Sequence, residues 1–203
     1  MTIADSEGCI LFCLQKAMEH FGYPVKDQKL VRPVIGNTPE LMLAFMSGET
    51  DKEKIQSMKT WYRNFSLGQS GKITFFPGVR EGLQQLHESG IKIGILSLKF
   101  YQLMHIPLER DGILPYIDRI SGAEQVTAPK PSPEGLLSLI DVFGISKDKT
   151  LYSGDSLIDQ LTAQNGGVDF AAMLLGATGL EKFSDAPMIA AFSCFNDLVK
   201  AIL

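Results

Sequence analysis

The sequence predicts an α/β fold, in which a parallel sheet flanked by helices carries an inserted all-helical subdomain. Three observations lead to this prediction. From about residue 77 onward, apolar strand-like runs alternate with amphipathic helical segments. Residues 11–70 show helical spacing and no alternating β-branched run. Pro77-Gly78 separates the two parts. We therefore expect residues 1–10 and 77–203 to form an α/β core, and residues 11–76 to form a helical cap.

Length, composition and charge fit an ordinary globular protein with one mid-sized domain. The 203 residues are 45% hydrophobic and 21% charged, as in ordinary globular domains. A net charge of −4 argues against a nucleic-acid binder with a basic surface. Asp5 and Glu7 interrupt the start, so a signal peptide is not expected, and no apolar run is long enough to span a bilayer. Three cysteines without metal-ligand spacing indicate reduced thiols. We expect a cytoplasmic monomer or homodimer.

The elements of the cap are predicted to be helices. The first helix has apolar residues at helical spacing and ends at Gly22. Thr38-Pro39 opens the second as N-cap and first-turn proline. The apolar positions of the three helices are Leu14, Ala17, Met18 and Phe21; Leu41, Leu43, Ala44 and Phe45; and Ile55, Met58, Tyr62 and Phe65. Residues 72–76 form a linker back to the core.

The elements of the core are predicted to alternate. A nearly continuous apolar run such as Ile91–Leu96 is typical of a strand that is buried on both faces of a parallel sheet. The predicted strands are residues 1–4, 91–96, 117–120, 150–153, 170–175 and 191–194. Between them, amphipathic helices start at Val79, Ser132-Pro133, Ser156 and Asn196. Such a sheet has right-handed crossovers and helices on both faces.

Polar residues follow three of the predicted strands. Asp5, Ser97 and Asp155 each come at the carboxyl end of one, which is the edge where ligands bind in parallel sheets. Asp5 and Glu7, at i and i+2 in an extended or turning segment, are predicted to face one site. Gly8 is predicted to let the backbone turn sharply there. The cap would cover this edge as a lid.

Four motifs in this order resemble those of the haloacid dehalogenase superfamily, and most closely its phosphoglycolate phosphatase and β-phosphoglucomutase-like branch. Asp5-Ser6-Glu7-Gly8-Cys9-Ile10 lies where the family has D-x-D-G-T-L. Ser97 follows an apolar strand, Lys130-Pro131-Ser132-Pro133 matches the lysine motif, and Gly154-Asp155-Ser156-Leu157-Ile158-Asp159 matches G-D-S-x-x-D. Phe76-Pro77-Gly78-Val79 is similar to the family's return from cap to core. The resemblance implies a Rossmann-like core.

The resemblance also implies a function: Mg²⁺-dependent hydrolysis of a small phosphate monoester, of the phosphoglycolate or sugar phosphate type, through an aspartyl-phosphate. Asp5 would be the nucleophile and Glu7 the acid/base, and Ser97 and Lys130 would hold the phosphoryl group. The implied magnesium ligands are Asp5, Glu7, Asp155 and Asp159. The implied substrate-binding residues are Gly8, Ser97, Leu98, Lys130 and, from the cap, Arg32 with the Gly36-Asn37-Thr38 turn. The partner would be a small phosphorylated metabolite, with no nucleic acid and no membrane.

Departures from the family pattern leave alternatives open. Glu7 stands where these phosphatases have aspartate, Cys9 where they have threonine, and Phe12 at their next acidic position. Misplacing an acid/base group costs about 10²–10⁴ in rate. One alternative is therefore a catalytically degenerate binding or regulatory protein on this fold, and another is a β-phosphoglucomutase-like phosphotransferase. Lys99 is interpreted as a surface charge near the mouth of the site.

Overall fold

The computed structural model describes residues 1–175, 179–183 and 187–203. The strands are β1 (Ala4–Asp5), β2 (Thr74–Phe75), β3 (Gly94–Leu96), β4 (Arg119–Ser121), β5 (Leu151–Gly154), β6 (Asp169–Met173) and β7 (Ala190–Phe192). The α-helices are α1 (Glu7–Phe21), α2 (Gln28–Val31), α3 (Pro39–Ser47), α4 (Lys52–Leu67), α5 (Val79–Glu88), α6 (Tyr101–Arg110), α7 (Glu134–Phe143), α8 (Leu157–Gly166) and α9 (Phe195–Ile202). Short 3₁₀ turns connect several of them, including Arg32–Val34 after α2.

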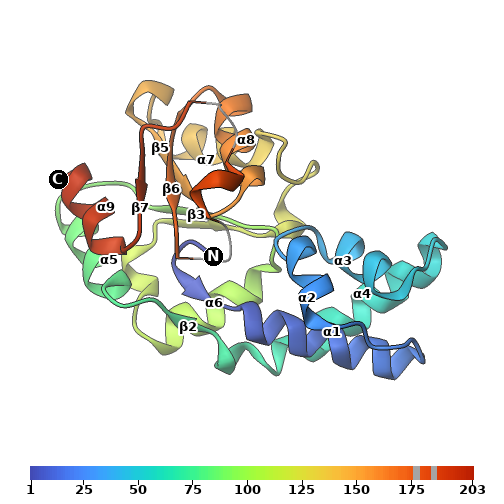
Figure 1. Cartoon of the computed structure of the whole chain (residues 1–203). Helices are drawn as coiled ribbons and strands as arrows, with labels where there is room; N and C mark the ends of the chain where they lie inside the picture. Colours follow the sequence, from blue (N-terminus) through green and yellow to red (C-terminus); the bar gives the residue numbers. More distant parts are fainter. Residues whose placement is uncertain (176–178, 184–186) are drawn as a thin grey trace.

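The predicted alternation of strands and helices in the core is confirmed. Strands β5, β6 and β7 pair in parallel in that order, with Ser153 opposite Ala171 and Ala172 opposite Ala191. Strands β3 and β4 form a second parallel pair, with Leu96 opposite Ser121. Figure 1 shows β5–β7 beside α7 and α8, with α5 and α9 together at one end of the molecule. Parallel strands joined by helices give the α/β core that the sequence predicts.

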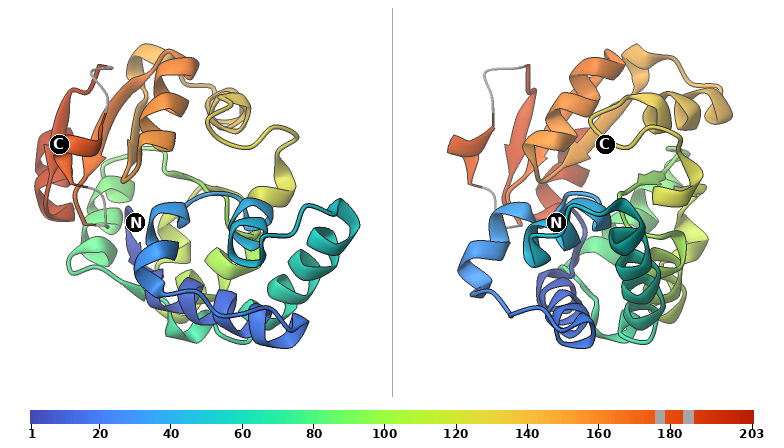
Figure 2. Two further views of the ribbon diagram at one scale, coloured as in Figure 1. Left: turned by 45° about the vertical axis from the view of Figure 1, so that its right-hand side comes forward. Right: turned by 90° about the vertical axis from the view of Figure 1, so that its right-hand side faces the viewer.

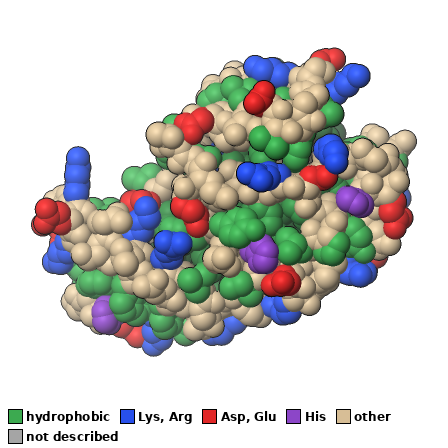
Figure 3. Space-filling view, turned by 180° about the vertical axis from the view of Figure 1, so that it is seen from behind, with side chains coloured by type: hydrophobic (Ala, Val, Ile, Leu, Met, Phe, Trp, Pro, Cys, Tyr) green, Lys and Arg blue, Asp and Glu red, His purple; other side chains and the backbone are tan. Residues whose placement is uncertain are grey.

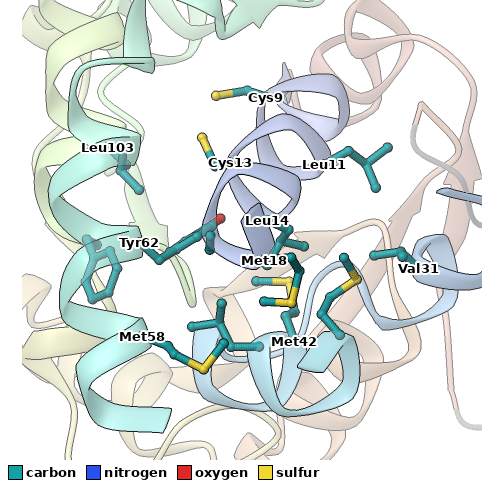
Figure 4. Packing of buried hydrophobic residues seen from close by; sticks show 14 of the residues in the cluster. Cys9, Leu11, Cys13, Leu14, Met18, Val31, Met42, Met58, Tyr62 and Leu103 are labelled. Atoms are coloured by element: carbon teal, nitrogen blue, oxygen red, sulfur yellow. The ribbon is translucent and has the colours of Figure 1, made fainter. Parts of the chain in front are cut away.

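The cap is built from α1 to α4. Figure 2 shows these helices, coloured blue to teal, gathered on one side of the molecule. A buried cluster holds them together, and Figure 4 shows its sulfur-containing and aliphatic side chains meeting between the helices. Leu103 of α6 joins this cluster from the core. Thr38 accepts a hydrogen bond from the Leu41 N–H at 3.4 Å and caps α3, as its Thr-Pro sequence predicts.

The first strand differs from the prediction. β1 pairs antiparallel with β2, so Ala4 lies opposite Phe75 and Asp5 opposite Thr74. The two segments that connect cap and core therefore form a ribbon of their own. Among the described residues, β1 pairs with neither β3 nor β5. Asp5 consequently does not stand at the carboxyl end of a strand of the parallel sheet.

The predicted turn at Gly8 is wrong, because Glu7 and Gly8 belong to the first turn of α1. Cys9, Cys13 and Ala17 are spaced by four residues and are all buried on one side of α1, so the helical pattern extends back to Ser6, its N-cap. Asp5 lies in a strand and Glu7 in a helix, and the alternation that would point both side chains to one site does not apply.

Within the described residues, no helix has both the length and the apolar composition needed to cross a membrane.

Candidate active site

Side chains from the core and the cap meet at one cavity of 1430 Å³. From the core it is lined by Ser97, Leu98 and Lys99 after β3, by Asp155 after β5, and by Lys130 and Asp159. From the cap it is lined by Glu7, Arg32, Gly36 and Asn37. The carboxyl ends of β3 and β5 therefore meet at this site, as parallel-sheet architecture predicts.

Lys130 and Asp159 form a buried ion pair at the centre of the core side. The Lys130 Nζ lies 2.5 Å from Asp159 Oδ1, and the two side chains are 12% and 7% exposed. Tyr152 donates its hydroxyl to the same oxygen at 3.2 Å, and Ser156 donates to Oδ2 at 2.6 Å. Burial raises the pKa of Asp159, but the Lys130 ammonium and these hydrogen bonds outweigh it and hold the pKa below its usual value. Asp159 therefore stays ionised.

Lys130 also stays charged, because its hydrogen-bond partners outweigh the effect of burial. Burial alone would lower its pKa, but Tyr152 and Asp159 raise it above the usual lysine value. Every carboxylate oxygen of Asp159 already has a hydrogen-bond donor. Asp159 therefore holds Lys130 in place at the cavity wall.

Asp155 lies at the carboxyl end of β5, and the first two residues of the chain contact its carboxylate. The Thr2 hydroxyl donates to Asp155 Oδ1 at 2.9 Å, and the Met1 amino group contacts Oδ2. The Asp155 N–H donates to Asp159 Oδ2 at 3.2 Å. The side chain of Asp155 is 23% exposed, so it remains accessible from the cavity.

The segment after β3 brings a hydroxyl and an ammonium group to the same place. The Lys99 N–H donates to Ser97 Oγ at 3.2 Å, which fixes the loop between them. Burial lowers the pKa of Lys99 to about 8, helped by repulsion from Lys130. Among the described residues, no carboxylate lies within ion-pair distance of the Lys99 ammonium. The interpretation of Lys99 as a surface charge is therefore wrong: it is a half-buried cation of the site.

On the cap side, Arg32 pairs with Glu7. The Arg32 Nε lies 2.8 Å from Glu7 Oε1, and the side chains are 59% and 20% exposed. Gly36 and Asn37 of the predicted cap turn line the cavity beside them. The structure thus pairs Glu7 with the cap arginine.

Of the four predicted magnesium ligands, the structure places Glu7, Asp155 and Asp159 at the cavity and Asp5 outside it. Asp5 is exposed, accepts a hydrogen bond from the Glu7 N–H at 3.1 Å, and does not line the cavity. Gly8, the predicted substrate contact beside it, is exposed within α1. Across residues 1–175, 179–183 and 187–203, no three His, Cys, Asp or Glu side chains lie close enough to hold a metal ion. The cause is the antiparallel pairing of β1, which removes Asp5 from the edge that carries Asp155.

Three contributors to the site were missed in the sequence. Lys99 lies two residues after Ser97, at the spacing that returns a side chain to the same side of an extended segment, and this signal was available. Tyr152 and Thr2 gave no signal, because their roles depend on contacts with Asp159 and Asp155 from distant parts of the chain.

Close packing at Gly154 gives a first prediction. A Cβ atom at this position would lie 2.2 Å from Asp159 Cβ and 2.5 Å from Asp159 Cγ. We expect Gly154→Ala to lower the free energy of unfolding by about 1–3 kcal/mol, because the Asp159 side chain must move. Gly8→Ala is the matched control: no described atom lies within 4 Å of its Cβ position, and alanine favours helix. Urea unfolding of both variants tests this, and equal stabilities would contradict the packing described.

Comparison with known proteins gives a consistent set of similarities. Residues 1–173 match the model of the family described as haloacid dehalogenase-like hydrolase. A phosphoglycolate phosphatase of Nitrosococcus oceani is 28% identical over 181 residues, which are 86% of this chain and 80% of the relative. The pyrophosphatase PpaX of Oceanobacillus iheyensis is 26% identical, over 85% of this chain and 78% of the relative. A crystal structure from Bacteroides fragilis, described as a haloacid dehalogenase-like hydrolase, superposes with a TM-score of 0.91 at 31% identity, covering 97% of this chain and 94% of that one.

Proposed function

Since the chain belongs to the haloacid dehalogenase-like hydrolase family, we propose that it hydrolyses a small phosphate monoester at the carboxyl ends of β3 and β5. The observation that carries this proposal is the meeting of Ser97, Lys99 and Lys130 at one cavity. A phosphoryl dianion needs positive charge and hydrogen-bond donors around its oxygens. Two ammonium groups and a hydroxyl supply both. Relatives named phosphoglycolate phosphatase and pyrophosphatase are consistent with this class of substrate.

Each residue has a separate task. Lys130 is fixed by Asp159 and Tyr152, so its charge is in place before the substrate arrives. Lys99 has no carboxylate partner among the described residues, and its charge is available to the phosphoryl oxygens. Ser97 donates its hydroxyl. The cap, with Arg32 and Asn37, covers the cavity from the other side, excludes water and contacts the leaving group.

Magnesium is part of this proposal with a smaller ligand set than the sequence predicted. Of the predicted ligands at the cavity, Asp155 pairs with neither Lys130 nor Arg32; it contacts the Thr2 hydroxyl and the Met1 amino group. Mg²⁺ commonly binds through one or two carboxylates, with water and substrate phosphate oxygens as the other ligands. Asp155 would hold the ion in this way, and the bound ion would cancel phosphoryl charge. Asp159 positions Lys130 and the Asp155 backbone, and acts on the metal site through them.

Phosphate binding tests the proposal. We expect inorganic phosphate, the common product, to bind the wild-type chain in calorimetric titrations. Ser97→Ala should weaken binding roughly two- to tenfold, the usual effect of removing one hydrogen bond. Mg²⁺ should strengthen phosphate binding to the wild type and not to Asp155→Asn. Failure of phosphate to bind, or binding unchanged in Ser97→Ala, would overturn the proposed site. Release of p-nitrophenol from p-nitrophenyl phosphate measures turnover in parallel.

The Arg32–Glu7 pair gives a second prediction, on the leaving group. Arg32 is exposed enough to exchange its carboxylate partner, so a carboxylate on the substrate competes with Glu7 for the guanidinium. We expect Arg32→Ala to weaken binding of 2-phosphoglycolate by about tenfold and to leave inorganic phosphate binding unchanged. Glu7→Gln should strengthen 2-phosphoglycolate binding, because it removes the competitor. Equal losses for both ligands in Arg32→Ala would contradict this role.

A further inference from the structure

Two thiols lie one helical turn apart on the cap side of the cavity. Cys9 and Cys13 belong to α1, at positions i and i+4, and both line the cavity. Residues at this spacing share one face of a helix, and Figure 4 shows the two side chains on the same side of α1. Both are free thiols. The proposed phosphate chemistry uses neither of them, so their place at the cavity calls for a role of its own.

The two thiols interact with each other. A hydrogen bond joins the side chains of Cys9 and Cys13, and the Cys9 thiol donates another to the Gln69 carbonyl at 3.5 Å. Four residues of an α-helix rise about 6 Å. This separation lies within the Cα–Cα range of about 4.4–6.8 Å that a disulfide spans. The backbone positions of the two cysteines therefore permit a bond between their sulfur atoms.

The charged groups that act on the Cys9 thiol are positive. They are the ammonium groups of Lys72, which precedes β2, and Lys99, which follows β3, and both favour the thiolate. A thiolate beside lysines is the nucleophilic form of cysteine. On the face shown in Figure 3, by contrast, basic and acidic side chains are interspersed, and the whole chain has a net charge of −4. The positive surroundings of Cys9 are thus a local feature of the cavity.

Cys194, the third cysteine of the chain, has different surroundings. It is partly exposed, whereas Cys9 and Cys13 are buried apart from the cavity that they line. Its thiol donates a hydrogen bond to the Asp197 carboxylate, so its neighbour is negative. It precedes α9, which Figure 1 shows far from α1. Cys194 is therefore an internal reference: a more accessible thiol with an acidic neighbour and without a second thiol beside it.

A bond between Cys9 and Cys13 requires a local change in α1. Cβ atoms four residues apart on a helix are separated by about 5–6 Å, whereas a disulfide holds them at about 3.5–4.5 Å. The first turn is the weakest part of α1, because the N-cap residue Ser6 makes no side-chain capping hydrogen bond and Gly8 is a weak helix former. The Ile10 N–H donates to the Ser6 carbonyl at 2.9 Å and closes this turn. A disulfide is therefore expected to open it.

We propose that Cys9 and Cys13 form a redox-active dithiol site, which a peroxide oxidises to a disulfide that opens the first turn of α1. The Cys9 thiolate attacks one peroxide oxygen, the O–O bond breaks, and a sulfenic acid forms as hydroxide leaves. The Cys13 sulfur then attacks the Cys9 sulfur, and the sulfenic oxygen leaves as water with the Cys13 proton. The thiol pair loses two electrons and the peroxide gains them. Because Glu7 belongs to the turn that opens, oxidation also acts on its pair with Arg32.

Hydrogen peroxide and mass spectrometry test the site on the full chain. After brief exposure to a small excess of peroxide, free thiols are alkylated with N-ethylmaleimide, and trypsin then releases residues 1–16, which contain both thiols. We expect this peptide to be unalkylated and lighter by two hydrogen atoms, and dithiothreitol to restore both thiols. Cys194 should remain alkylated. The thiols of residues 1–16 should be lost at least about tenfold faster than that of Cys194.

Three alanine variants separate the two steps. In Cys13→Ala, oxidation of Cys9 should stop at the sulfenic acid, which dimedone traps. In Cys9→Ala, Cys13 should stay reduced at the same peroxide concentration. Cys194→Ala is the matched control, and its residues 1–16 should form the disulfide at the wild-type rate. The wild-type peptide tests the proposal by itself if a variant fails to fold.

Hydrogen exchange measures the opening of the turn. In the oxidised chain the Ile10 amide should exchange faster, whereas the Tyr23 amide, bonded to the Met18 carbonyl at 2.9 Å beyond the other end of α1, should be unchanged. Three results would contradict the proposal: Cys194 oxidised as fast as residues 1–16, a sulfinic acid at Cys9 in place of the disulfide, or unchanged Ile10 exchange in the disulfide form. None of these readouts involves phosphate, so they are independent of the proposed function.

Discussion

Lys130→Met is expected to lower the free energy of unfolding by about 3–5 kcal/mol, the cost of leaving a buried charge without its partner. In this variant Asp159, 7% exposed in the wild type, keeps the hydrogen bonds from Tyr152 and Ser156 but loses the ammonium group. Methionine has a similar volume, so lost packing contributes little. Urea unfolding at pH 7 measures the effect.

The double variant Lys130→Met/Asp159→Asn is the control for this prediction. It removes both charges and keeps an acceptor for Ser156, so we expect it to recover most of the lost stability. A double variant no more stable than Lys130→Met would show that the pair does not act as described.

The free energy of unfolding of the wild type and of Lys130→Met is expected to depend on pH in different ways. The pKa of Asp159 is held below the unfolded value of about 3.9. The stabilisation by the pair is therefore present above about pH 4 and is lost as the pH falls through the lower folded value. In Lys130→Met, burial without the ammonium raises the pKa of Asp159. The stability gap between wild type and variant should consequently narrow from pH 7 to pH 5.

Lys99→Met is expected to weaken inorganic phosphate binding by about 10- to 100-fold without loss of stability. The ammonium is half-buried and has no carboxylate partner among the described residues, so its removal breaks no ion pair. Because burial lowers the pKa of Lys99 to about 8, phosphate binding by the wild type should also weaken as the pH rises through 8. Calorimetric titrations at pH 7 and pH 9 measure both effects.

Lys92→Met is the matched control for Lys99→Met. Lys92 precedes β3, is 53% exposed and pairs with Asp118 at 2.8 Å. It lines the same cavity but lies at the amino end of β3, opposite Ser97 and the phosphate site, so its loss should leave phosphate affinity unchanged. If phosphate affinity falls equally in both variants, or is unchanged in Lys99→Met, then Lys99 does not contribute to the phosphate site.

The fold and part of the site were accessible from local sequence patterns. Helical spacing and the apolar runs predicted the order of elements, because the periods of helix and strand are local properties. Ser97, Lys130, Asp155 and Asp159 were also predicted to lie together, and the structure brings them to one cavity. Three of them follow strands or open helices of the core, where the parallel architecture alone fixes which ends meet.

Asp5 and Glu7 show where this reasoning fails. The same short sequence can occur at a sheet edge and at a helix start: a carboxylate, a second carboxylate two residues later and then a glycine. Strand partners decide between the two, and the pairing of β1 with Thr74–Phe75 joins residues about 70 positions apart, which no local pattern reports. The four-residue spacing of Cys9 and Cys13, which are both buried in the structure, was the available signal that the helix begins before residue 11.

Tungstate soaked into crystals of the wild-type protein tests the central claim most directly, because its anomalous scattering locates a phosphate-like oxyanion. The account predicts a peak at the carboxyl ends of β3 and β5, with oxygens about 3 Å from the Ser97 hydroxyl and from the Lys99 and Lys130 ammonium groups. A peak at Arg32 alone, or no peak at this edge of the core, would contradict it.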